Sequence, residues 1–82
     1  MHEAALAQAI LDTVLKNVST KSKKITQINI VAGKMSSIVK ESLDLYFSEF
    51  SKETIASNAI LNLDVKPISK TFVESVEVED ES

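Results

Sequence analysis

The spacing of the apolar residues changes from segment to segment along this chain, and this restricts the possible folds more than any other feature of the sequence. Over residues 3–19 the apolar side chains recur at helical spacing, with Leu6, Ile10 and Val14 four residues apart. A stripe of this kind is typical of a helix that buries one face. The spacing therefore predicts a first helix from residue 3 to residue 19.

The next segment, residues 25–32, has the two-residue period of a β-strand. Ile28 and Ile30 fall on one face, whereas Gln27 and Asn29 fall on the other. This alternation predicts a strand with one buried face and one polar face. The polar face would be open to solvent or to a partner.

Gly33, the only glycine in the chain, follows this strand. We expect it to supply a turn with a positive φ angle, which glycine adopts at no steric cost. A second helical stripe runs over residues 39–50, where Leu43, Phe47 and Phe50 share one face. Aromatic residues at this spacing are more often part of a core than of a ligand site, so we expect a second core helix.

Two further segments have strand character. Leu61, Leu63 and Val65 alternate with polar residues, and Pro67 should end the pairing of that strand because proline has no amide hydrogen to donate. A third strand is predicted over residues 76–79. Since only a short connection joins the last two strands, we expect them to form an antiparallel pair.

The predicted order is therefore α-β-α-β-β, which belongs to the α+β class. A strand–helix–strand crossover within one sheet favours parallel pairing. We thus expect a small three-stranded mixed sheet with two helices packed on one face, in a single domain that spans residues 1–82. The predicted core consists of Leu6, Ile10, Val14, Ile28, Ile30, Leu43, Phe47, Leu61, Leu63 and Val76.

The composition excludes several classes of protein. There are no cysteines, which rules out disulfides, thiol catalysis and cysteine-ligated zinc. The formal net charge of −3 argues against nucleic-acid binding, which requires a basic surface. With no signal peptide and no apolar segment long enough to cross a membrane, we expect a cytoplasmic protein with no membrane partner. Without a nucleophile motif or a glycine-rich phosphate loop, we do not expect an enzyme.

The amino terminus is the candidate functional site. Met1 should be retained, because His2 is too large for efficient removal of the initiator methionine. The α-amino group of Met1, the His2 amide nitrogen and the His2 imidazole can close adjacent chelate rings around one metal ion, and the amide of Glu3 comes next. A near-planar set of nitrogen donors suits Ni(II) or Cu(II) better than Zn(II). One histidine is a weak metal signal, so an incidental His2 is the competing interpretation of the residues alone.

Several segments together resemble one known family. The start Met1-His2-Glu3, the helix behind it and the strand that ends at Gly33 are similar to the HypA/HybF family of hydrogenase nickel-insertion proteins. The resemblance covers nearly the whole chain, and its specific part is the start together with the helix that follows. Further matching residues are Leu6-Ala7-Gln8, Ile10-Leu11, Leu43, Phe47, Thr54-Ile55-Ala56, Ala59 to Leu63, Pro67 and Glu74 to Glu79.

The resemblance implies a metallochaperone that delivers Ni(II) to the large subunit of [NiFe]-hydrogenase together with a partner GTPase, HypB. It also implies a nickel site at His2, to which Met1 and Glu3 contribute main-chain groups. One departure from the family is large. Its members carry a zinc-binding domain with two Cys-x-x-Cys pairs, and here that domain is absent between Pro67 and Phe72. We therefore expect no zinc.

Two hypotheses of function follow from the resemblance and the departure. The first is a nickel-binding maturation factor reduced to its nickel-binding domain, which the retained His2 favours. The second is a metal-free interaction or dimerisation module, which the missing zinc domain favours. An open edge strand in a three-stranded sheet invites pairing with a second copy, so a homodimer through such a strand is a further expectation.

Overall fold

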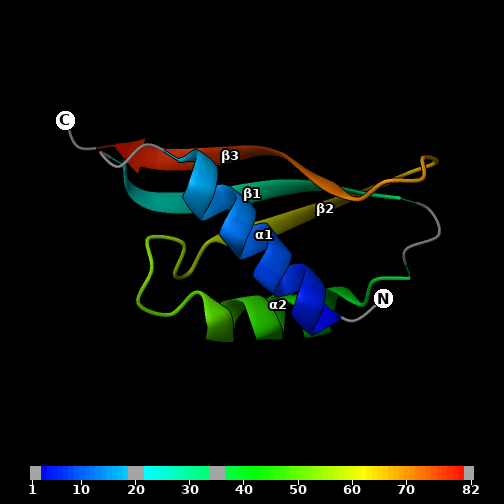
Figure 1. The fold of residues 1–82 in the computed structure, drawn as a ribbon, viewed down its shortest axis with the longest axis horizontal. Helices are drawn as coiled ribbons and strands as arrows, with labels where there is room; N and C mark the ends of the chain where they lie inside the picture. Colours follow the sequence, from blue (N-terminus) through cyan, green and yellow to red (C-terminus); the bar gives the residue numbers. More distant parts are fainter. Residues whose placement is uncertain (1–2, 19–21, 34–36, 81–82) are drawn as a thin grey trace.

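The computed structural model describes residues 3–18, 22–33 and 37–80. Within these residues two helices and three strands form in the predicted order, and both helices lie on the same face of one sheet (Figure 1). The predicted α+β class and the mixed sheet are thus confirmed. The elements are α1 (Glu3–Asn17), β1 (Ser22–Gly33), α2 (Lys40–Phe50), β2 (Ile60–Lys66) and β3 (Phe72–Asp80).

The central strand is β1, and the order of the sheet is β2-β1-β3. Strand β2 runs parallel to β1, with Ile28 beside Leu61, and α2 lies in the crossover between them. Strand β3 runs antiparallel to β1, with Ile28 beside Val76. The expected pairing of the last two strands is therefore wrong, because β2 and β3 lie on opposite sides of β1.

The burial of β1 gives the physical reason for this order. Its buried apolar residues are Ile25, Ile28, Ile30, Val31 and Ala32. These residues span most of β1, which has 12 residues and is the longest of the three strands. Such a strand is best protected with a neighbour on each side. After β2 the chain therefore passes the end of β1 and pairs along its far side instead of folding back as a hairpin.

Gly33 lies where this connection passes the end of β1. It does not have a positive φ angle, so the expected turn conformation is wrong. A Cβ atom at this position would lie 2.8 Å from the carbonyl oxygen of Ile68 and 3.1 Å from that of Lys70. The Gly33 amide also donates a hydrogen bond to Thr71 Oγ1 at 3.1 Å. The glycine is needed here because the connection packs directly against its backbone.

We expect Gly33→Ala to lower the free energy of unfolding by about 1–3 kcal/mol, because the added methyl group forces the backbone at Ile68 to move. Urea denaturation followed by circular dichroism measures this change. Ser69→Ala, an exposed change in the same connection, is the matched control and should stay within about 0.5 kcal/mol of the parent. Equal stability of the two variants would show that residues 67–71 can move away from the added methyl group without lowering the free energy of unfolding.

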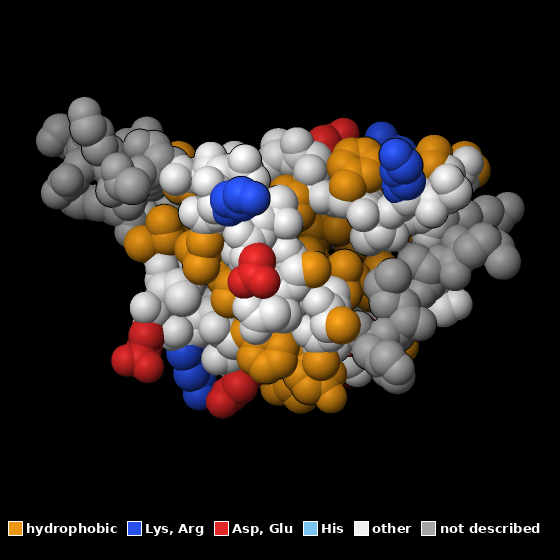
Figure 2. Space-filling model, in the orientation of Figure 1, with side chains coloured by type: hydrophobic (Ala, Val, Ile, Leu, Met, Phe, Trp, Pro, Cys, Tyr) orange, Lys and Arg blue, Asp and Glu red, His pale blue; other side chains and the backbone are white. Residues whose placement is uncertain are grey.

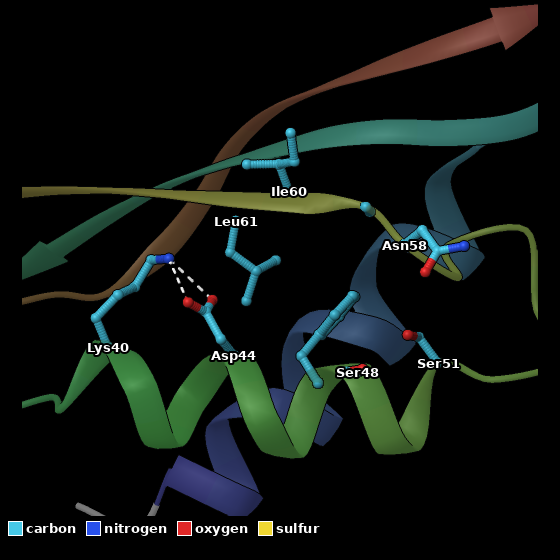
Figure 3. Close-up of a pocket in the computed structure, with 9 residues that line it drawn as sticks. Lys40, Asp44, Ser48, Ser51, Asn58, Ile60 and Leu61 are labelled. Atoms are coloured by element: carbon cyan, nitrogen blue, oxygen red, sulfur yellow. Dashed lines mark hydrogen bonds and ion pairs between the residues drawn. The ribbon is translucent and has the colours of Figure 1, made fainter.

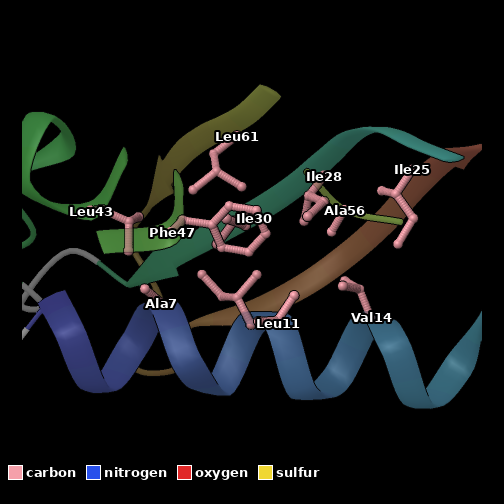
Figure 4. Packing of buried hydrophobic residues seen from close by; sticks show 11 residues of the cluster. Ala7, Leu11, Val14, Ile25, Ile28, Ile30, Leu43, Phe47, Ala56 and Leu61 are labelled. Carbon is pink, nitrogen blue, oxygen red and sulfur yellow. The ribbon is translucent and has the colours of Figure 1, made fainter. Parts of the chain in front are cut away.

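The core lies between the sheet and the two helices (Figure 4). Leu6, Leu63 and Val76 are predicted core residues that the structure leaves only partly buried, packed against the buried cluster. In Figure 4 the Phe47 ring points from α2 into the space between α1 and the sheet. The other predicted core residues are all buried: Ile10, Val14, Ile28, Ile30, Leu43, Phe47 and Leu61.

Candidate functional site

The proposed metal ligands belong to the start of the chain, where α1 begins. Met1 and His2 lie outside the described residues, so their role as ligands stays a prediction. Glu3 is the first residue of α1. The donors assigned to the site either precede this residue directly or belong to its main chain. The contacts of α1 at this end therefore determine how firmly such a site would be held.

The Glu3 carboxylate caps the other helix. Its Oε2 accepts a hydrogen bond from the main-chain amide of Val39 at 2.9 Å. Val39 is the N-cap residue of α2, and its own side chain makes no capping hydrogen bond. A carboxylate at this point also interacts favourably with the partial positive charge of the helix amino terminus. The contact thus ties the starts of the two helices together.

Through this contact the Glu3 carboxylate is engaged with α2. One helical turn later Ala7 is fully buried, and Leu11 is buried one turn after that. The first turns of α1 are therefore fixed both by the core and by α2, and a metal site built on them would have a rigid base.

Within the described ranges, no three His, Cys, Asp or Glu side chains gather at a point where they could hold a metal ion. None of the helices described there is long and apolar enough to cross a membrane. Figure 2 shows the face that carries α1, where the lysine side chains are scattered among acidic and uncharged ones and form no continuous basic patch. Nucleic-acid binding depends on such a patch.

A groove of about 270 Å³ lies between α2 and the start of β2 (Figure 3). Its lining includes the apolar side chains of Phe47 and Leu61 and an ion pair between Lys40 Nζ and Asp44 Oδ2, which are 2.8 Å apart. Ser51 also lines the groove and is fully buried, and its Oγ has no hydrogen-bond partner among the described residues. Sequence reasoning missed this groove, because it depends on how α2 packs against the start of β2 and not on the pattern within either element.

The sheet face opposite the helices is polar, as the alternation in β1 predicted. Asn62 Nδ2 of β2 donates hydrogen bonds to Gln27 Oε1 and Asn29 Oδ1 of β1, both at 2.8 Å. Asn29 Nδ2 in turn donates to Ser75 Oγ of β3 at 3.0 Å. This row of hydrogen bonds crosses all three strands and supports their order. It contains no titratable group, so we assign it no role in proton transfer.

Comparison with known proteins links the chain to one family. A family model described as "Hydrogenase/urease nickel incorporation, metallochaperone, hypA" matches residues 1–72. The hydrogenase maturation factor HypA of Dehalococcoides mccartyi is 27% identical over 116 aligned residues, which cover 100% of this chain and 98% of that protein. The hydrogenase maturation factor HypA of Archaeoglobus fulgidus is 37% identical over 67 residues, which cover 80% of this chain and 61% of the relative.

The fold also has a solved counterpart. The solution structure of the Ni metallochaperone HypA from Helicobacter pylori matches with a TM-score of 0.69 and covers 99% of this chain and 100% of that chain. The two sequences are 18% identical, so this match concerns the fold alone. The arrangement of two helices on a three-stranded sheet is thus shared with a protein of known structure.

Proposed function

Since the chain belongs to the HypA family of hydrogenase and urease nickel-incorporation metallochaperones, we propose that it binds Ni(II) and hands it on during the maturation of [NiFe]-hydrogenase. The observation that carries this proposal is the family match, which begins at residue 1 and so includes the metal-competent terminus. The family consists of metallochaperones, which confirms that the chain is not an enzyme.

In this proposal Met1, His2 and Glu3 hold the nickel ion. The amino group of Met1 and the amide nitrogens of His2 and Glu3 are successive donors along the main chain, and the His2 imidazole closes the set. Deprotonated amides and an imidazole favour the square-planar geometry that Ni(II) accepts and Zn(II) does not. The hydrogen bond from Val39 to the Glu3 carboxylate supports a main-chain role for Glu3. Nickel is the cargo here and leaves with the acceptor.

We further propose that the chain is a HypA protein reduced to its nickel-binding domain. The alignment with the D. mccartyi protein runs over 116 positions, whereas this chain has 82 residues, so the relative has residues that this chain lacks. The chain has no cysteine with which to build a zinc site of the family's kind. Residues 67–71 connect β2 to β3 and close the sheet by packing on Gly33. The zinc domain would thus be missing between Pro67 and Phe72.

The partners proposed for this function are a HypB-type GTPase and the hydrogenase large subunit, and the proposed location is the cytoplasm. These assignments rest on family membership. The second candidate function is a metal-free interaction module that kept the fold and lost metal delivery. The specific observation in its favour is the edge strand β2, where Ile60 and Val65 are largely exposed.

A complementation experiment separates the two functions. In a host that has lost its own HypA protein, we expect the parent chain to restore hydrogenase activity and the His2→Ala variant to fail. Gln8→Ala, an exposed change on α1, is the matched control and should restore activity like the parent. Failure of the parent chain itself to restore activity would favour the metal-free module. Restoration by the His2→Ala variant to the parent's level would remove His2 from the proposed site.

A further inference from the structure

Strand β2 forms one free edge of the sheet. Among the described residues it pairs with β1 on one side only, so alternate residues direct main-chain amide and carbonyl groups outward. Two large apolar side chains on this strand are mostly exposed, Ile60 at 59% and Val65 at 61%. An edge strand with these properties is a template for another strand.

The other edge of the sheet, β3, discourages such pairing. Its nine residues include Glu74, Glu77, Glu79 and Asp80 and contain no lysine or arginine. Two copies of β3 side by side would therefore collect acidic side chains without any compensating base, and like charges on neighbouring strands repel. On β2, by contrast, the one acid Asp64 is balanced by the one base Lys66. The charges thus direct self-association to the β2 edge.

The helix-facing side of β2 is incompletely covered. Leu61, Leu63 and Val65 share this side of the strand, and their exposure increases in that order from buried to largely exposed. Leu61 points toward α2 and lines the groove between α2 and β2 (Figure 3). The apolar row of β2 is therefore covered by the helices at Leu61 and uncovered at Val65. Val65 lies on the helix face of the sheet without a helix above it.

We propose that a second copy of this chain pairs antiparallel with β2, with Leu63 on the two-fold axis, so that the two sheets join into one of six strands. If all four helices lie on one side of the joined sheet, a β2 residue that faces the helices in one copy must lie opposite a β2 residue that faces the helices in the other copy. Pairing about Leu63 meets this condition and uses the whole of β2, all 7 residues. It places Val65 of each copy beside Leu61 of the other.

The alternative registers are less favourable. An axis at Asp64 would set the two Asp64 carboxylates opposite each other, and an axis at Asn62 or Val65 would shorten the ladder. In the proposed register Asp64 lies opposite Asn62, which carries no charge. Ile60 lies opposite Lys66, whose apolar stem covers it while its ammonium group stays in water. The pairing thus buries both exposed apolar residues of β2 and opposes no like charges.

The association state tests the choice of edge. We expect sedimentation equilibrium of the untagged chain to show a dimer, and Val65→Lys to weaken dimerisation by about tenfold or more, since it places a charge against Leu61. Leu45→Lys is the matched control: Leu45 is exposed at 70% on α2, and its replacement should leave the dimer unchanged. A parent chain that stays monomeric, or equal effects of the two variants, would overturn the proposal.

Cysteine cross-linking tests the register, because the chain has no cysteine of its own. Under mild oxidation the Leu63→Cys variant should form a disulfide-linked dimer, since its two cysteines meet at the axis. The Val65→Cys variant should not, because in this register its cysteines lie about 13 Å apart along the strands, beyond the reach of a disulfide. Cross-linking of Val65→Cys, or of neither variant, would contradict the register. The inference is independent of nickel, so the His2→Ala chain should dimerise like the parent.

Discussion

Replacing Phe47 by alanine is expected to lower the free energy of unfolding by about 3–5 kcal/mol. The ring is only 2% exposed and belongs to the central cluster between α1, α2 and the sheet (Figure 4). Its removal leaves a cavity that the packed strands and helices can close only in part. Domains of this kind are stable by about 5–15 kcal/mol in total, so this loss is a large part of the free energy of unfolding.

Urea denaturation monitored by circular dichroism gives the size of this effect. Tyr46→Ala is the matched control. Tyr46 precedes Phe47 on α2 but is 42% exposed, and its ring makes a tilted contact with that of Phe50, at 6.0 Å between ring centroids. It should cost no more than about 1.5 kcal/mol. If the two variants lost equal stability, Phe47 would not be a core residue and the orientation of α2 would be wrong.

The elements and their buried faces could be predicted from the sequence because they depend on local periodicity. The stripe of Leu43 and Phe47 fixes the face of α2, and the stripe of Ile10 and Val14 fixes that of α1. A crossover through α2 then implies that β2 is parallel to β1, as the structure has it.

The sheet order could not be predicted, since it depends on contacts between distant segments. A short connection suggested a hairpin, but the burial of β1 outweighs it. Val31 was the one residue in the sequence that could have indicated a central β1. It occupies a position where alternation predicts a polar residue, and it is 1% exposed in the structure. The role of Gly33 was missed for the same reason, because its requirement comes from Ile68 and Lys70 and not from its own φ angle.

The candidate site also has one part that the sequence predicts and one part that only the structure shows. The chelating donors of Met1, His2 and Glu3 are joined by covalent bonds, so their proximity follows from the sequence alone. The hydrogen bond between Glu3 and Val39 joins two helices across 36 positions and is visible only in the structure. Ser51, buried without a partner for its hydroxyl among the described residues, likewise had no local signal.

The second large effect is expected at the terminus. His2→Ala removes the only imidazole in the chain, so we expect specific Ni(II) binding to be lost. The fold should be retained, because residue 2 precedes the first apolar position of α1. Far-ultraviolet circular dichroism and the urea midpoint of the variant should therefore match those of the parent.

The pH dependence of binding has a definite sign. Ni(II) must displace protons from the Met1 amine, the main-chain amides and the His2 ring, so affinity should fall as the pH falls. A near-planar nitrogen site should also hold Ni(II) in its low-spin, diamagnetic form. Titrations at several pH values, with magnetic susceptibility of the loaded protein, check both properties. Affinity that did not change with pH would exclude deprotonated amides as donors.

Calorimetric titration of Ni(II) into the untagged chain with its free amino terminus tests the central claim most directly. The parent is expected to bind one Ni(II) per chain. The His2→Ala variant is expected to show no specific binding. A chain extended by Gly-Ser before Met1, which keeps the imidazole but removes the terminal amine from the chelate, should also lose the site. Equal affinity of the parent and the His2→Ala variant would contradict the assignment of His2 as a ligand, and with it the proposal that this chain carries nickel.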